Sequence, residues 1–303
     1  MGKRQKTNND YYSEIAQFII EKLEDGTVPW VRTWQSFSDG LLRNPVTGTE
    51  YRGINRLLLG LACPYDNPFF FTFNNVKKLG GKVKKGSKSF PVYFMSKIKT
   101  KEVIGEVELP CGKTEEQRKE IFVIKSYRVF NAEQCDGLPK EYYPIPQTED
   151  EKKGQYEINP TAEAIIHDYL NNATIKLENG SPAYSPSCDT IYMPRQSKFD
   201  SYDSYISTMF HEMAHSTGAA HRLDRLNTAN AARYSKAYGL EELVAEMSSA
   251  QLCGLIGANS QIDNSAAYIN GWMQSIREEP RIVWQAATRA ERATNYILDT
   301  SSQ

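Results

Sequence analysis

The chain has 303 residues, of which 40% are hydrophobic and 24% are charged. These proportions are ordinary for a globular protein, and the length allows two domains. No apolar run is long enough to cross a bilayer, and residues 1–10 lack the apolar stretch of a signal peptide, so we expect a cytoplasmic protein without membrane contact. The five cysteines are scattered and form no C-x-x-C pair, which argues against a disulfide scaffold or a thiolate metal site.

The net charge of −1 hides an asymmetry between the two halves of the chain. Residues 1–130 hold 22 basic and 14 acidic residues, a net charge of +8, whereas residues 131–303 hold 14 and 23, a net charge of −9. Halves of opposite sign suggest two domains with different partners. The basic half is the candidate to bind a polyanion.

The N-terminal half has the pattern of a small α+β domain. Apolar residues at helical spacing predict a helix over 12–23, and a second helix is predicted through 57–61. Turn residues and aromatic runs then predict a strand over 69–73, a short helix over 74–79, a hairpin with a Gly-Ser turn over 82–94 and a strand over 121–130. Residues 98–120 are interpreted as a mobile excursion between strands.

Nine lysines and no acidic residue lie between Asn67 and Lys101, interleaved with aromatic residues on predicted strands. Lysines attract phosphates and exposed aromatic rings stack on bases, so this composition predicts a surface for single-stranded DNA. The alternative is an ordinary solvated face, because composition alone is a weak argument. Tyr93 is the candidate stacking ring, and capping of the second helix is the alternative role for Asn55. The candidate DNA-binding residues are Arg52, Asn55, Lys77, Lys84, Lys85, Lys88 and Tyr93.

A polar, acidic stretch separates the two halves. We place a linker at 146–155, so the predicted domains are 1–145 and 156–303. In the second domain a helix is predicted over 161–170, followed by strands over 174–177 and 189–193 on either side of a proline-rich turn.

The strongest signal in the chain is the motif H-E-x-x-H from His211 to His215. Two histidines four residues apart on a helix project from one face and can bind one divalent ion. Glu212 is placed to take a proton from a metal-activated water, as in zinc-dependent hydrolases. The motif follows an apolar helical run and is closed by Gly218, a typical helix stop, which favours a metal site over an ordinary amphipathic helix.

A catalytic zinc takes three protein ligands, and the residues alone leave two candidates for the third. The stretch through Gly218 to His221 fits the pattern H-E-x-x-H-x-x-G-x-x-H, in which the glycine returns His221 to the metal. The other candidate is a helix predicted over 240–250, where Glu242 and Glu246 lie one turn apart among small residues. That arrangement suggests a ligand and a partner that orients a ligating histidine, with a solvated acidic stripe as the alternative.

Further segments carry a family resemblance: Trp30, the turn 48–55, the segment 82–93, residues 211–218 with the following Arg222-Leu223-x-Arg225, and residues 241–246. Together they resemble the ArdC-type antirestriction proteins of mobile elements such as conjugative plasmids, which join an N-terminal single-stranded-DNA-binding domain to a zincin-like metallopeptidase domain. The resemblance implies an α+β fold and one Zn²⁺ per chain, held by His211, His215 and Glu242, with Glu246 orienting a ligand. His221 departs from the pattern expected of the family and remains the alternative ligand.

The expected function is protection of incoming DNA from restriction. Residues 1–145 would bind single strands, and the zinc site would hydrolyse peptide bonds, with a restriction component as a candidate protein substrate. One alternative is a cytoplasmic zinc protease of regulatory proteins. Another is a non-catalytic DNA-shielding protein with a structural metal, against which Glu212 argues because a structural site needs no general base.

Overall fold

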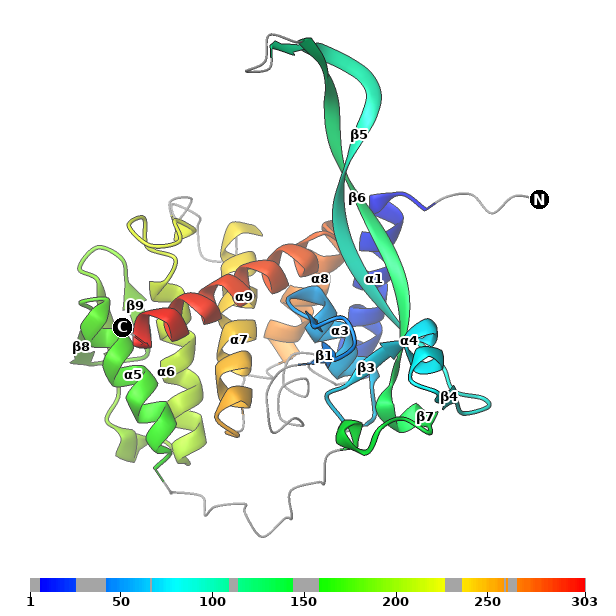
Figure 1. Cartoon of the computed structure of the whole chain (residues 1–303). Coiled ribbons are helices and arrows are strands. Elements are labelled where there is room, and N and C mark those ends of the chain that lie inside the picture. The colour runs from blue at the N-terminus through cyan, green and yellow to red at the C-terminus, as the bar shows by residue number, and fades with distance from the viewer. Residues whose placement is uncertain are drawn as a thin grey trace.

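The structure is a computed structural model that describes residues 6–25, 42–65, 67–108, 114–143, 158–226, 236–258, 260 and 266–302. It is an α+β protein, as predicted from the sequence (Figure 1). Trp30 and the predicted linker at 146–155 lie outside the described residues.

The N-terminal part contains three helices and several antiparallel strand pairs among its described residues. The helices are α1 (Asn8–Glu24), α3 (Ile54–Ala62) and α4 (Phe73–Lys78), with short 3₁₀ turns at Ala132–Gln134 and Lys140–Tyr142. The strands are β1 (Arg43–Asn44), β2 (Thr49–Glu50), β3 (Phe70–Thr72), β4 (Lys82–Val83), β5 (Phe90–Glu108), β6 (Thr114–Asn131) and β7 (Cys135–Asp136). They form an antiparallel sheet in the order β3-β6-β5 and the separate pairs β1-β2 and β4-β7.

Two predictions for this region are wrong. The segment 82–94 is not a hairpin, because β4 pairs with β7 whereas β5 pairs with β6. Residues 98–108 and 114–120 are not an excursion between strands but part of β5 and β6, which run on together to Glu108 and Thr114 with a register shift near Val103. The resulting two-stranded ribbon projects far from the rest of the molecule (Figure 1).

The C-terminal part contains a small sheet and five helices among its described residues. The helices are α5 (Pro160–Asn172), α6 (Tyr202–Ser216), α7 (Lys236–Leu255), α8 (Ala266–Glu278) and α9 (Ile282–Ser301), with a 3₁₀ turn at Gln196–Lys198. The strands are β8 (Lys176–Asn179), β9 (Ala183–Ser185) and β10 (Thr190–Met193). The central β10 is parallel to β8 and antiparallel to β9, which lies within the stretch predicted as a proline-rich turn.

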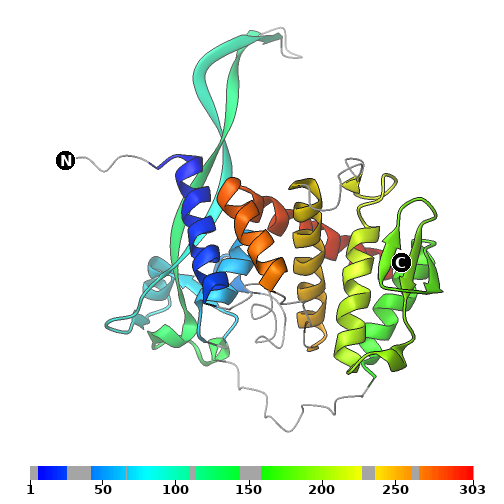
Figure 2. The ribbon, with the colours of Figure 1, turned by 180° about the vertical axis from the view of Figure 1, so that it is seen from behind.

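The two parts of the chain share one hydrophobic core. Figure 2 shows α1, α8, α7 and α6 side by side in one layer, with α9 crossing behind them. The apolar stripe of α1 packs against α8 and α9, and the Tyr12 ring meets the Trp284 ring of α9 edge-on at 5.7 Å between centroids. At the start of α3, the Gly53 amide donates a hydrogen bond to the Glu291 carboxylate of α9 at 3.2 Å. The N-terminal part is therefore packed directly against α8 and α9 of the C-terminal part.

Within the described ranges, no helix is both long enough and apolar enough to span a membrane.

Candidate metal centre

The metal-site motif lies in the last two turns of α6, which packs against α7. Ser201 caps the start of α6, where its hydroxyl accepts a hydrogen bond from the Ser204 amide at 3.1 Å. Small residues allow α6 and α7 to approach closely, so that the Ser249 hydroxyl donates to the Ser207 carbonyl at 2.7 Å. This contact holds one face of α7, including Glu242 and Glu246, against the histidine face of α6.

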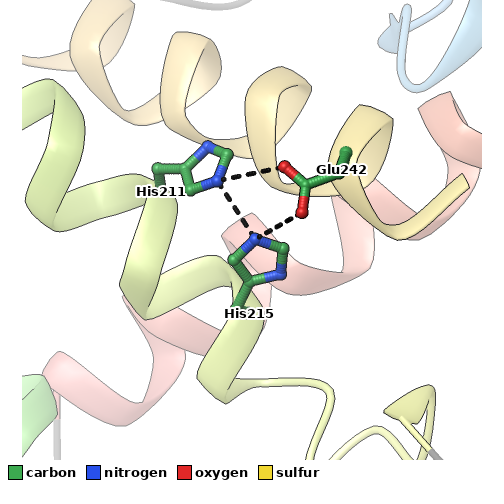
Figure 3. A group of neighbouring side chains, drawn as sticks. All are labelled: His211, His215 and Glu242. Atoms are coloured by element: carbon green, nitrogen blue, oxygen red, sulfur yellow. Dashed lines mark hydrogen bonds and ion pairs between the residues drawn. The ribbon is translucent and has the colours of Figure 1, made fainter. Parts of the chain in front are cut away.

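Three potential ligand atoms converge between the two helices (Figure 3). The Nε2 atoms of His211 and His215 lie 3.0 Å apart, and each lies 3.6 Å from an oxygen of Glu242. Two ligands held about 2.1 Å from a tetrahedral ion are roughly 3.4 Å apart, so these separations fit a common ion. The three side chains are 12 to 19% exposed, and a fourth position open to water or substrate remains compatible with this arrangement.

A carboxylate faces the other ring nitrogen of each histidine. Glu246 lies 3.6 Å from Nδ1 of His211, and Glu241 lies 3.4 Å from Nδ1 of His215. Such carboxylates fix the tautomer that leaves Nε2 free for a metal. Burial by itself would lower the pKa of His211, but the negative charges of Glu246, Glu242 and Glu212 raise this pKa to about 9. The site therefore favours a cation.

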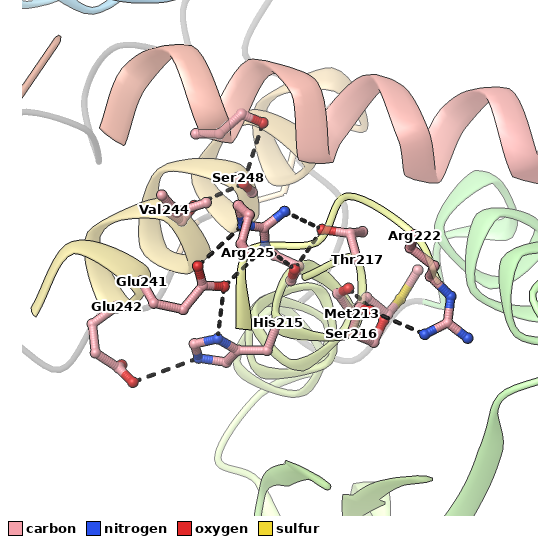
Figure 4. A network of polar contacts seen from close by, with 12 residues as sticks. Met213, His215, Ser216, Thr217, Arg222, Arg225, Glu241, Glu242, Val244 and Ser248 are labelled. Atoms are coloured by element: carbon pink, nitrogen blue, oxygen red, sulfur yellow. Dashed lines mark hydrogen bonds and ion pairs between the residues drawn. The ribbon is translucent and has the colours of Figure 1, made fainter. Parts of the chain in front are cut away.

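The sequence alone assigned no role to Glu241, and its contact with Arg225 now shows that role (Figure 4). Arg225 donates to both carboxylate oxygens of Glu241, at 3.0 Å from Nε and 2.9 Å from Nη2. It also donates to the Thr217 hydroxyl and the Ala214 carbonyl, each at 2.8 Å. Burial alone would raise the pKa of Glu241, but His215 and Arg225 lower it, so the carboxylate stays charged beside the histidine. The Arg222-x-x-Arg225 spacing was the available signal.

Gly218 ends the helix and returns the chain toward α7. A side chain there would place Cβ 2.9 Å from the Leu226 side chain and 3.1 Å from the His215 carbonyl, so only glycine fits without a shift. The Gly218 carbonyl accepts hydrogen bonds from the amides of Arg225 and Leu226 at 2.9 and 2.8 Å. The turn therefore delivers Arg225 to Glu241.

The structure does not bring His221 to the other two histidines. Its Nε2 lies 3.3 Å from the Asp189 carboxylate, and its side chain is 61% exposed. Asp189 in turn binds Arg222 at 2.9 and 2.7 Å, which anchors this part of the loop to the β10 side of the molecule. The pattern H-E-x-x-H-x-x-G-x-x-H with His221 as third ligand is not supported, because the glycine turn brings Arg225 rather than His221 toward the site.

Two sequence models of known families match the chain. Residues 9–130 match the N-terminal domain of anti-restriction factor ArdC, and residues 160–289 match a zincin-like metallopeptidase. The metal-free crystal structure of the antirestriction protein ArdC from plasmid R388 is 31% identical, with a TM-score of 0.75, and the match covers 97% of this chain and 98% of that one. The chain belongs to the ArdC antirestriction family. The Mn(II)-bound structure of the same protein matches with 30% identity and a TM-score of 0.73 over 97% of this chain and 99% of that one.

Longer relatives share the same region. Two proteins named DNA primase TraC from Escherichia coli are each 32% identical over 95% of this chain. The chain spans about a quarter of the length of one and a fifth of the other, at 27% and 20%. The protein y4eC of Sinorhizobium fredii is 26% identical, over 96% of this chain and 92% of its own length. The family and the Mn(II)-bound relative support a divalent metal at the zincin-like centre.

In this ArdC family member, two of the candidate DNA-binding residues lie inside the protein. Tyr93 is 4% exposed and packs edge-on against Tyr11 and Trp284, at 5.6 and 6.5 Å between ring centroids. Asn55 is 5% exposed, and its side chain amide pairs with both the carbonyl and the amide of Tyr93, at 2.7 and 2.6 Å. Both predictions are corrected, because the ring belongs to the core and the asparagine joins α3 to β5.

The candidate lysines lie on the surface of α4 and of the turn after β4. Ser87 donates its amide to the Lys84 carbonyl at 3.2 Å, and Gly86 takes the positive φ of 87° that this turn requires. The Phe73 ring is 48% exposed, with the Lys77 ammonium 5.0 Å from its centroid. Arg52 is exposed as well, but it pairs with Glu50 at 2.6 Å. We call the exposed basic residues of α4, β4 and this turn the α4–β4 surface: Lys77, Lys78, Lys82, Lys84, Lys85 and Lys88.

Proposed function

We propose that the chain is a single-stranded-DNA-binding antirestriction protein with a zinc metallopeptidase centre. The observation that supports the metal centre most strongly is the orientation of its two histidines. Their Nε2 atoms and a Glu242 oxygen face one point, while Glu246 and Glu241 face the Nδ1 atoms. Two nitrogens and one carboxylate are the ligand set of a hydrolytic zinc site with an open fourth position, so these residues would hold one Zn²⁺.

The chemistry proposed is hydrolysis of a peptide bond. Zinc at such a site acts as a Lewis acid and lowers the pKa of a bound water. Glu212 follows His211 on α6 and is 6% exposed, so it would accept the proton of the attacking water in an environment shielded from bulk solvent. A structural metal would give no reason for a buried carboxylate at this position.

The α4–β4 surface is the proposed site for single-stranded DNA. Its lysines would neutralise phosphates, and Phe73 replaces Tyr93 as the ring available for a base. Arg52 is a further candidate because it is exposed, although a phosphate would have to compete with Glu50. In this proposal, bound DNA brings the metal centre close to proteins that act on the same strand, such as a restriction component.

One experiment tests the DNA site. Labelled oligo-dT should bind the full chain more tightly than a duplex of equal length, with log Kd depending on log salt at about 0.7 per neutralised phosphate. Lys84→Ala with Lys85→Ala should make this slope shallower, and Phe73→Ala should weaken binding without changing it. Lys176→Ala with Lys198→Ala, two exposed lysines outside this surface, is the matched control. Equal affinity for duplex and single strand would overturn the stacking proposal.

A second experiment tests the centre. Zinc-loaded protein should cleave an unfolded protein substrate, as measured by mass spectrometry of fragments, and more so with oligo-dT present. Glu212→Gln should keep the zinc content and melting temperature but lose cleavage. Retained cleavage would exclude Glu212 as the base, and no cleavage by the zinc-loaded wild type would favour a DNA-shielding role for the protein.

A further inference from the structure

The β5–β6 ribbon leaves the body of the molecule where two asparagines hold it. Asn55 pairs with the backbone of Tyr93 on β5. On β6, the Asn8 side chain donates to the Phe122 carbonyl and accepts from the Ile124 amide, both at 2.8 Å. Outward from these points the ribbon projects alone (Figure 1), and we call residues 95–108 and 114–123 the arm. Thirteen residues of β5 beyond Met95 extend for roughly 40 Å at about 3.3 Å per residue.

The arm exposes apolar side chains on a ribbon whose outer edges are unpaired. Among the described strands β5 pairs only with β6, and β6 pairs with β3 only from Val129 to Asn131. Long unpaired edges with apolar side chains are sites where another chain adds, and soluble monomers normally avoid them. The large apolar residues of the arm that are 38 to 58% exposed are Met95, Ile98, Val103, Ile104, Ile121 and Phe122.

Charge is segregated along the arm. The half nearer the body, residues 96–101 and 118–123, contains five basic residues and one acidic residue, Glu120. The outer half, residues 102–108 and 114–117, contains five glutamates and neither lysine nor arginine. The strand register places Glu106 directly opposite Glu116. The outer half carries five negative charges and no positive one, so a basic partner would complement it.

We propose that the arm is a dimerisation element that pairs with the same arm of a second copy of this chain. In an antiparallel two-fold arrangement the acidic outer half of each arm lies against the basic inner half of the other, because an isologous contact repeats each pairing twice. The exposed aliphatic residues Ile98, Val103 and Ile104 flank the boundary between the halves, near the two-fold axis, and would be buried there. DNA fits the arm less well, since the outer glutamates repel phosphate.

The test is a charge exchange between two variants of the full chain. The mass in solution, measured by light scattering and analytical ultracentrifugation, should correspond to a dimer that dissociates as salt is raised. Lys97→Glu with Lys99→Glu, and separately Glu106→Lys with Glu108→Lys, should each weaken the dimer at least tenfold. Mixing the two variants should restore association, because the arms are again complementary. Lys176→Glu with Lys198→Glu makes the same charge change away from the arm and should leave the dimer intact.

The results that overturn the proposal are distinct from failure of the proposed DNA and metal functions. A wild-type protein that stays monomeric up to about 0.1 mM, which excludes a Kd in the micromolar range, rules out the dimer. So does a dimer that all the arm variants retain, or a variant mixture that stays monomeric. Arm variants that lose oligo-dT binding while the wild type is monomeric would assign the arm to DNA instead. Circular dichroism of each variant shows that the fold is kept.

Discussion

Glu241→Gln should both destabilise the metal-free protein and weaken zinc binding, because Glu241 joins His215 to Arg225. The pair is buried, with side-chain exposures of 12% for Glu241 and 6% for Arg225. Breaking a buried ion pair costs about 3–5 kcal/mol, since the remaining charge has no partner. Glutamine keeps one oxygen as an acceptor, and the guanidinium keeps its bonds to Thr217 and Ala214, so we expect the lower end, about 3 kcal/mol.

The assay is urea denaturation in the presence of a chelator, followed by zinc competition with a chromophoric chelator. The matched control is Glu50→Gln, which removes the carboxylate from another Arg–Glu pair, here with Arg52 62% exposed. An exposed pair contributes less than about 1 kcal/mol, so the control should change little. Zinc affinity of Glu241→Gln should fall by about 10- to 100-fold, because the carboxylate no longer orients His215. Equal stability losses in the two variants, or unchanged zinc affinity, would refute the role of the Arg225–Glu241 pair.

Glu242→Ala should lower zinc affinity by on the order of tenfold to a hundredfold or more, whereas His221→Ala should leave it unchanged, as measured by chelator competition. Asn55→Ala should lower the free energy of unfolding by about 2 kcal/mol or more, because the buried amide and carbonyl of Tyr93 lose their partners. Asp189→Asn should flatten the loss of stability in acid. Burial alone would raise the pKa of Asp189, but hydrogen bonds from Arg222 lower it below the usual value near 4. The charged carboxylate therefore stabilises the fold above about pH 4, and this stabilisation is lost as the pH falls through the lowered pKa.

Each of these expectations has a contrary result. An equal loss of zinc affinity in Glu242→Ala and His221→Ala would indicate that His221 is also a metal ligand. Asn74→Ala, at an exposed position on α4, is the control for Asn55 and should stay within about 0.5 kcal/mol of the wild type. Parallel curves of melting temperature against pH for the wild type and Asp189→Asn would show that the Arg222 contact does not stabilise the fold.

The parts of the metal centre that follow helical periodicity could be predicted from the sequence. The position of His211 and His215 on one helix face depends only on residues four apart, and Glu242 with Glu246 follows the same rule on the next helix. Glu241 could not be assigned in this way, because its role depends on the loop after Gly218. That loop closes through contacts with α7, which local spacing does not encode.

The N-terminal part was harder to predict for two opposite reasons. Tyr93 was expected on the surface, yet α1 and α9, far away in sequence, cover it. The outer part of β5 and β6 was expected to be a mobile excursion between strands, because a ribbon that is solvated on both faces lacks the alternation of apolar and polar residues that marks a strand. Local composition could predict neither the long-range packing that buries Tyr93 nor the projecting ribbon of β5 and β6.

The packing of α1 against α8 and α9 affects the order in which the chain can fold. About 260 residues separate the end of α1 from the start of α9. At a synthesis rate of about 5–20 residues per second, the apolar stripe of α1 waits roughly 13–52 s on the ribosome before its last partner emerges. A helix of this length is marginally stable alone, so until then only the contacts of Asn8 and Tyr11 with β5 and β6 can hold α1, and its face toward α8 and α9 stays uncovered.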